Sequence, residues 1–349
     1  MRVKGWWAGL AACVLVCGAM GVKKVMDHYK IDTYPMERVD TVSVGRGSVG
    51  VFDQYEIRAY GASYDNVLMV SNAAMSELSF NTWVDNRWKE IEKEDAKQSP
   101  EHLPTINRVS PCAVWFKFGY IEVDDKPSKI TAYQGEGAVW MNNKAIFLAP
   151  SGKYKADTKI PKMIGRLRER LPEHKDTGLC ADFYCLEMPP AKSERVSVNI
   201  GFPGIKGLTL SVKIESYDTQ QKESRLQGGT TYKIPVEKVP ELPVTTEYPA
   251  PETGNAGSLL GEQNISGGTE KMGNGKYRTS IGASWYYAGT SGNPNDPSVE
   301  IDLLYGYITE HKPSTMGWFD DETVKQTGFT PEKFMSMWEA TLKSFKRHR

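Results

Sequence analysis

The 349-residue sequence has no excess of charge of either sign, because 43 Lys and Arg residues balance 43 Asp and Glu residues. Proteins dedicated to polyanions are usually strongly basic, so this balance argues against a nucleic-acid partner. Histidine is scarce, and there is no CxxC pair and no close pair of histidines. The sequence thus offers no spacing typical of metal ligands, and we expect no metal or other cofactor.

The signature motifs of common hydrolases and nucleotide-binding enzymes are missing as well. There is no HExxH, no GxxxxGK[ST] and no GxGxxG that opens a helix. The nearest approach to a lipase-type GxSxG motif is Gly282-Ala283-Ser284-Trp285-Tyr286, which lacks the final glycine and lies in a strand pattern. We therefore expect a protein without catalytic residues and without enzymatic activity.

One long apolar run stands out near the N-terminus. Residues 5–22 read GWWAGLAACVLVCGAMGV, with Arg2 and Lys4 before the run and two lysines after it. A positive start followed by an apolar stretch marks a segment handled by the export machinery, so residues 1–25 are expected to be an export signal or a membrane anchor. The run is also long enough to span a bilayer core. A retained anchor, a cleaved signal and a lipoprotein at Cys13 all remain open, and the rest of the chain is expected in the periplasm.

Three of the five cysteines follow this segment, at Cys112, Cys180 and Cys185. An oxidising compartment permits disulfides, and three thiols allow at most one internal bridge. Cys180 and Cys185 are close in sequence and are the first choice for a bridge that pins a turn. The alternative is that all three are buried as small apolar side chains.

The apolar pattern of the exported part predicts mainly strands. Two adjacent asparagines tolerate positive φ, so Asn142-Asn143 is expected to form the tight turn of a hairpin. Alternation with a period of two predicts antiparallel strands with one buried face. The expected strands cover residues 41–45, 49–61, 112–123, 138–141, 144–148, 196–200, 208–214, 277–287 and 299–308.

Three stretches carry helical spacing. Trp83, Arg87, Trp88 and Ile91 predict one helix, and a stripe from residue 160 to residue 171 predicts a second. The third begins with Thr330 as the expected N-cap and Pro331 at the first helical position, and its basic C-terminal end runs to Arg349.

Composition divides the exported part at a proline-rich segment. Residues 241–256 are the predicted linker, with the boundary near residue 245. On each side, at 36–240 and 257–349, strands combine with one or two helices. The expected fold class is therefore α+β, with two domains that each contain antiparallel strands and one or two packed helices.

Short segments spread from about residue 40 to the end resemble, in the same order, segments of a known family. They are Ser43-Val44-Gly45-Arg46, Gly178-Leu179-Cys180 with the strands up to Ser216, Gly257 to Glu262, Ser284-Trp285 with Asp296 to Ile301, and Met337-Trp338-Glu339 to Arg349. Through them the chain resembles the periplasmic immunity proteins of type VI secretion lipase effectors, specifically the fourth phospholipase effector family. The family's first cysteine corresponds to Ser43 here, so Cys180 would pair with Cys185 or Cys112, or form no bridge.

This resemblance implies a two-domain antidote that binds a cognate phospholipase effector one-to-one. It would clamp the effector and block its active-site entrance or its lid. No nucleic acid is implied, and the membrane is involved only through the N-terminal segment.

Aromatic side chains are the expected anchors of such an interface. Our candidates for partner binding are Trp318, Phe319, Trp285 and Tyr286. Two other functions remain open: an envelope module that binds a glycan or small molecule through aromatics such as Trp285, and an exported hydrolase with an unfamiliar site.

Overall fold

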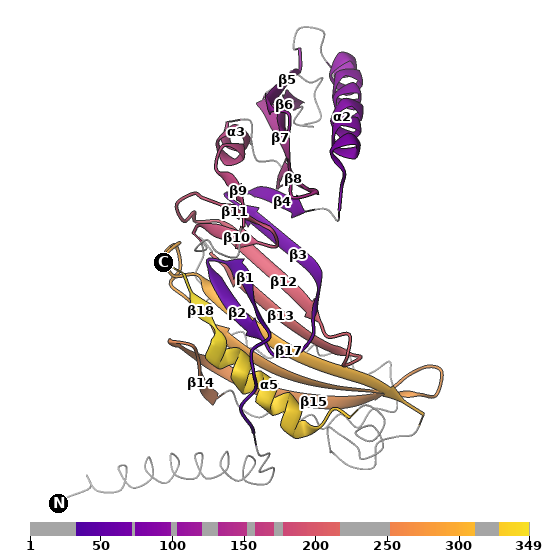
Figure 1. Ribbon diagram of the computed structural model, residues 1–349, viewed down its shortest axis with the longest axis vertical. Helices are drawn as coiled ribbons and strands as arrows, with labels where there is room; N and C mark the ends of the chain where they lie inside the picture. Colours follow the sequence, from indigo (N-terminus) through magenta and orange to yellow (C-terminus); the bar gives the residue numbers. More distant parts are fainter. Residues whose placement is uncertain are drawn as a thin grey trace, which may run out of the picture.

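The computed structural model describes residues 33–71, 74–98, 103–120, 132–151, 158–170, 177–216, 252–310 and 328–348. Within these ranges the chain is mostly β-structure, arranged as two antiparallel sheets with three helices (Figure 1). None of the described helices is long and apolar enough to cross a membrane. The predicted export segment, residues 1–25, lies outside the described residues.

The larger sheet contains twelve strands in the order β14-β15-β16-β17-β13-β12-β3-β4-β8-β7-β6-β5. Neighbouring strands are antiparallel throughout, as expected from the alternating sequence pattern. In that order their bounds are Glu252–Ala256, Leu259–Lys271, Tyr277–Tyr287, Ser298–Thr309, Leu208–Glu215, Glu194–Gly201, Glu56–Tyr64, Val67–Ser71, Lys144–Pro150, Ala132–Met141, Ala113–Tyr120 and Thr105–Ser110.

The smaller sheet contains six strands in the order β18-β2-β1-β10-β11-β9. In that order their bounds are Lys346–Arg347, Gly47–Val51, Asp40–Gly45, Leu179–Ala181, Tyr184–Leu186 and Leu167–Glu169. It packs against one face of the larger sheet, which we call the inner face, and the main core lies between the two.

Strand alternation fills this core. Val196, Val198 and Ile200 of β12 are all buried, and so are their counterparts on β13, whose burial alternates strictly between buried and half-buried residues. Because successive side chains of a strand point to opposite faces, this pattern directs the apolar residues inward and leaves the polar ones on the outer face. The predicted strands at 196–200 and 208–214 are confirmed.

Helix α5, Pro331–Ser344, closes the core from below. The Thr330 side chain accepts a hydrogen bond from Lys333 N at 3.2 Å, and Pro331 occupies the start of the helix, as predicted. The predicted basic helix end is only partly correct, because Lys343 lies in the last turn but the chain leaves the helix at Phe345 and then forms β18. Phe345 is buried, and burying it turns the last residues into a strand that pairs with Ser48 and Gly47 of β2.

Helix α2, Glu77–Gln98, covers β5–β8 on the outer face and confirms the helix predicted around Trp83. The contact forms a second, smaller core around Phe80, Val84, Phe116 and Ala145. The Asn142-Asn143 turn is also confirmed, with φ of 48° and 54° between β7 and β8.

The predicted helix from residue 160 to residue 171 is only partly correct. Helix α3 spans Lys159–Ile164 and ends at Gly165. Leu167 belongs to β9 and pairs with Leu186 of β11, so a sheet partner far along the chain overrides the local helical spacing. Ile160 and Ile164 are buried, as the apolar stripe required.

The predicted α+β class is confirmed only in part, because the described residues form many more strands than helices. The fold is mostly β, and the larger sheet runs across the predicted boundary because β13 pairs with β17 from Leu208–Tyr305 to Glu215–Ser298. The two-domain division is therefore not confirmed. Strand β14 occupies the last five residues of the predicted linker, 241–256, and the rest of that linker lies outside the described residues.

Candidate partner interface

Helix α2 covers β5–β8 on the outer face of the larger sheet, and the neighbouring strand β4 is exposed on that face. Leu68 and Val70 of β4 point to this face and are 42% and 54% exposed, while Val67 and Met69 point into the core. Figure 1 shows α2 standing beside β5–β8, with β3, β12, β13 and β17 curving away below β4. We call α2 together with β5–β8 the α2 lobe, and we call the rest of the larger sheet, from β3 to β14, the main sheet. The two exposed apolar side chains of β4 therefore lie between the α2 lobe and the main sheet.

Register fixes what surrounds Leu68 and Val70. Leu68 pairs with Ser63 of β3, and Gly61 of β3 pairs with Ser197 of β12. Gly61 is exposed and the two serines are half-buried. We call Leu68, Val70, Gly61, Ser63 and Ser197 together the β4 shelf. Small side chains beside two apolar ones let a partner approach the sheet closely, and apolar area that remains exposed is available for burial by that partner.

Helix α2 forms a rigid wall on one side of this shelf. Val70 pairs with Phe147 of β8, whose ring lies 4.5 Å from that of Trp83 between centroids. Arg87 of α2 donates from Nε and Nη2 to the two carboxylate oxygens of Glu136 on β7, at 2.8 and 2.9 Å. A bidentate pair fixes orientation as well as distance, so the helix is held firmly on the sheet.

The exposed face of β4 could not be predicted from the sequence. Val67-Leu68-Met69-Val70 is apolar at every position, so its alternation in burial cannot be read from residue types. The preceding Asp65 and Asn66 adopt φ of 49° and 65°, the values of a tight turn. The signal that could have revealed the shelf was a strand that is apolar at every position and follows such a turn. Such a strand is either covered on both faces or has one apolar face exposed.

Further along the outer face, Asp302 of β17 accepts a hydrogen bond from Ser284 Oγ of β16 at 2.6 Å. Burial raises the pKa of Asp302 to about 6, the hydrogen bond from Ser284 opposes that change, and the nearby Glu300 adds to it. Ser284 sits in the middle of β16, not at a strand-to-helix turn. The described residues contain no group of three or more His, Cys, Asp or Glu side chains suited to a metal ion.

The predicted aromatic anchors fall into two groups. Trp285 is fully buried, its Nε1 donates to Gly254 O at 3.0 Å, and its ring stacks on that of Tyr287. Tyr286 is 5% exposed. Trp285 belongs to the main core, where its ring packs against that of Phe345 with centroids 6.5 Å apart, and neither side chain is exposed to a partner in this structure. Trp318 and Phe319 lie outside the described residues.

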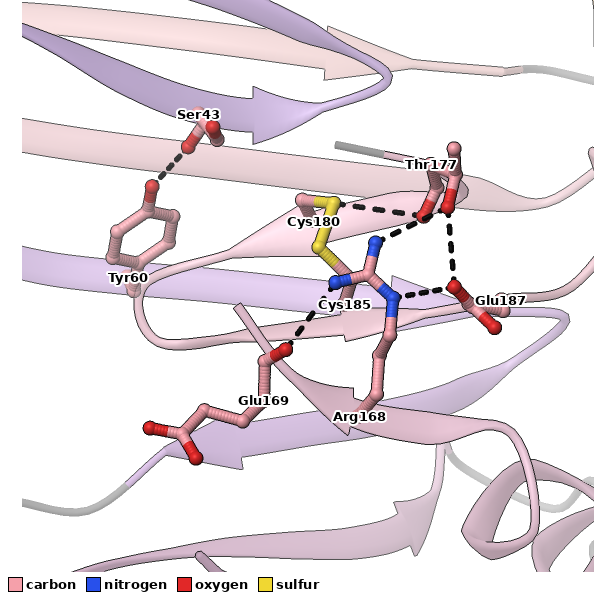
Figure 2. The surroundings of a disulfide bond; sticks show 8 residues. All are labelled: Ser43, Tyr60, Arg168, Glu169, Thr177, Cys180, Cys185 and Glu187. Carbon is pink, nitrogen blue, oxygen red and sulfur yellow. Dashed lines mark hydrogen bonds and ion pairs between the residues drawn. A yellow bond between two sulfur atoms is a disulfide. The ribbon is translucent and has the colours of Figure 1, made fainter. Parts of the chain in front are cut away.

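The structure contains a disulfide between Cys180 and Cys185. The two residues are direct partners across the β10–β11 hairpin, with Cα atoms 4.0 Å apart and Sγ atoms at 2.05 Å. Figure 2 shows Arg168 of β9 beside the bridge, hydrogen-bonded to Glu187 and, at 3.1 Å, to Thr177 Oγ1. The bridge therefore pins the hairpin in the middle of the smaller sheet, away from the β4 shelf.

Solved structures place this architecture among known folds. The immunity protein TplEi of the type VI secretion system (T6SS) from Pseudomonas aeruginosa, in its apo form, matches with a TM-score of 0.61 and 14% identity, covering 88% of this chain and 96% of TplEi. The same protein complexed with "L" peptide matches with a TM-score of 0.61 and 14% identity, covering 89% and 99%. The chain has the fold of T6SS immunity proteins.

A third match supports the same reading of the fold. A chain in the crystal structure of the Tle4–Tli4 complex aligns with a TM-score of 0.63 and 14% identity, over 90% of this chain and 99% of that one. No protein-family model and no curated protein matches the sequence. The similarity is therefore one of fold, at 14% sequence identity.

Proposed function

We propose that this chain is an immunity protein that binds and inhibits a cognate T6SS phospholipase effector in the periplasm. The observation that carries the proposal is the match in fold to TplEi and to a chain of the Tle4–Tli4 complex over about nine tenths of the sequence. The second of these structures is a complex, and TplEi is described as an immunity protein, so a binding role is the one we transfer to this chain. Inhibition by binding needs surface complementarity rather than a reactive residue.

We place the effector contact at the β4 shelf. The shelf exposes two apolar side chains beside small residues, lies next to helix α2 and is part of the outer face of the larger sheet. A partner seated there touches the α2 lobe on one side and the sheet below on the other, which is the arrangement required to clamp it and block its active-site entrance or lid. A stable complex of this kind buries about 1,200–2,000 Å² in total, more than the shelf alone supplies, so α2 and the lower strands must contribute.

Periplasmic co-expression tests the proposal. A phospholipase effector, sought among the products of the genes adjacent to the one for this chain, is directed to the periplasm of a sensitive bacterium, with and without the full-length chain. We expect growth to stop with effector alone and to recover with the chain present.

A chain that lacks residues 2–25 is the control for compartment. It should remain in the cytoplasm and fail to protect. If the full-length chain is exported in soluble, folded form and still gives no protection, the proposed function is wrong.

A further inference from the structure

A second feature of the molecule lies far from the β4 shelf. The segment from Thr33 to Arg38 crosses one side of α5 and leaves a groove with a volume of about 610 Å³. That volume lies within the range of about 300–1,000 Å³ typical of small-molecule sites. The groove takes no part in the proposed effector contact.

Hydrogen bonds at both ends hold the groove open. Tyr34 N donates to Ser336 Oγ of α5 at 3.0 Å, and Val39 N donates to Val51 O of β2 at 2.8 Å. The chain between these two anchors arches over the helix. Ala340, one turn beyond Ser336, contributes only a methyl group to the helix side, so space remains under the arch among the residues that the structure describes.

The lining combines apolar walls with cations. Tyr34, Met36 and Phe52 supply aromatic and thioether surface, and Arg38 and Lys343 lie at the rim. Both cations are exposed, and within the described ranges neither forms an ion pair. Glu339 is the one acidic residue in the lining, so the groove carries an excess of positive charge.

We infer that this groove binds an anionic phospholipid of the membrane, with the lipid phosphate between Arg38 and Lys343 and the first part of an acyl chain against Tyr34, Met36 and Phe52. Arg and Lys side chains form charge-assisted hydrogen bonds with phosphate oxygens. Cations close to an anionic membrane surface are also attracted to it electrostatically. The volume of the groove fits a lipid headgroup and the first part of an acyl chain, and the rest of the lipid stays in the bilayer.

The position of the groove in the chain agrees with this occupant. Ten residues separate the apolar run at 5–22 from Thr33, and an extended chain spans at most about 3.5 Å per residue. The groove therefore lies within about 35 Å of the end of the export segment. A phospholipid bound there would hold the α5 side of the protein toward the membrane and leave the β4 shelf accessible.

Calorimetric titration with a short-chain lipid tests the inference without interference from the N-terminal segment. The protein as isolated from the cell envelope is titrated with dihexanoyl phosphatidylglycerol, kept below its micelle concentration, and separately with dihexanoyl phosphatidylcholine. We expect saturable binding of the anionic lipid and at least tenfold weaker binding of the zwitterionic one. Glycerol phosphate should bind weakly, since it lacks the acyl chain.

Two variants locate the site. Arg38→Glu with Lys343→Glu removes the cations, and Ala340→Trp fills the groove; each should weaken phosphatidylglycerol binding at least tenfold. Arg278→Glu, an exposed charge reversal on β16, is the matched control and should bind like wild type. Equal binding of the two lipids, or unchanged binding by both groove variants in folded form, would overturn the inference. Ala340→Trp should still inhibit the effector, so this result is independent of the proposed function.

Discussion

Arg46 and Glu194 form a bidentate ion pair where the two sheets meet. Arg46 Nε and Nη2 donate to the two carboxylate oxygens of Glu194 at 2.9 and 2.8 Å, and Nη2 also donates to Met188 O at 2.8 Å. Glu194 accepts a further bond from Ala191 N at 2.7 Å. The two side chains are 14% and 7% exposed, so the smaller sheet, through Arg46 after β1, is fastened to β12 by a nearly buried charge pair.

Breaking this pair should destabilise the protein strongly. Glu194→Gln leaves the guanidinium of Arg46 buried without a counter-charge, which costs about 3 kcal/mol of unfolding free energy. Urea denaturation followed by fluorescence measures the loss. Glu56→Gln is the control, because Glu56 pairs with Arg58 on the surface and should lose less than about 0.5 kcal/mol. Equal losses in the two variants would contradict this account of the junction.

The Cys180–Cys185 bridge should contribute about 2 kcal/mol to stability, since it closes a short loop in the unfolded chain. Cys180→Ala with Cys185→Ala should lower the unfolding free energy by that amount, whereas Cys112→Ala should not alter the bridge. Thiol counting in denatured, unreduced protein from the periplasm provides the direct check. Peptide mapping restricts the count to Cys112, Cys180 and Cys185 and leaves out Cys13 and Cys17 of the N-terminal segment. One free thiol is expected among those three positions, and free thiols at all three would rule the bridge out.

Asp302 predicts a specific dependence of stability on pH. Its pKa is raised by burial to about 6 from an ordinary value of 3.8, so the folded state holds this proton more tightly than the unfolded state. The favourable contribution of the protonated Asp302 to the unfolding free energy is complete below about pH 4 and is lost as the pH rises through 6. Asp302→Asn should therefore gain stability relative to wild type between pH 4 and pH 7, by at most about 3 kcal/mol.

Asp296 provides a control of opposite sign for the Asp302 experiment. Burial alone would raise its pKa, but hydrogen bonds from Thr290, Arg347 and Tyr287 hold the pKa below its ordinary value. Asp296→Asn should lose stability at neutral pH, and the loss should shrink as the pH falls. A difference between wild type and Asp302→Asn that stays constant from pH 4 to pH 7 would contradict the assignment.

Substitutions in the β4 shelf should weaken binding to the effector without destabilising the fold. Leu68→Glu with Val70→Glu places two charges on side chains that are about half exposed, so the melting temperature should change little. Binding to the effector should weaken at least thirtyfold, the effect of losing a contact worth about 2 kcal/mol. Leu260→Glu, at an exposed position on β15, is the control and should bind normally. Wild-type affinity in the double variant would place the interface elsewhere.

Local chemistry made part of the fold predictable. Thr330 and Pro331 specify a helix start by their own hydrogen bonding and φ, and Asn142-Asn143 specifies a turn by tolerating positive φ. These signals act within a few residues, and the structure agrees with them. The short distance along the chain between Cys180 and Cys185 likewise made them the first choice for a bridge.

Contacts between distant parts of the chain decided what the sequence could not show. Leu167 joins a strand because β11 offers it a partner, and β13 joins β17 across the proline-rich segment. The burial of Trp285 was not predictable, because residue type does not reveal that Phe345, sixty residues further along, packs against its ring. The β4 shelf is exposed because α2 packs on β5–β8 and not on β4, and the sequence does not reveal which strands a helix will cover.

The central claim is inhibition by direct binding, and an equimolar inhibition assay tests it most directly. The purified chain is mixed with the candidate phospholipase effector from the protection experiment, phospholipid hydrolysis is measured, and the mass of the complex is determined by light scattering. The account predicts a one-to-one complex and nearly complete loss of lipase activity at equimolar concentration. A lipase that keeps full activity and elutes separately from the folded chain would contradict it.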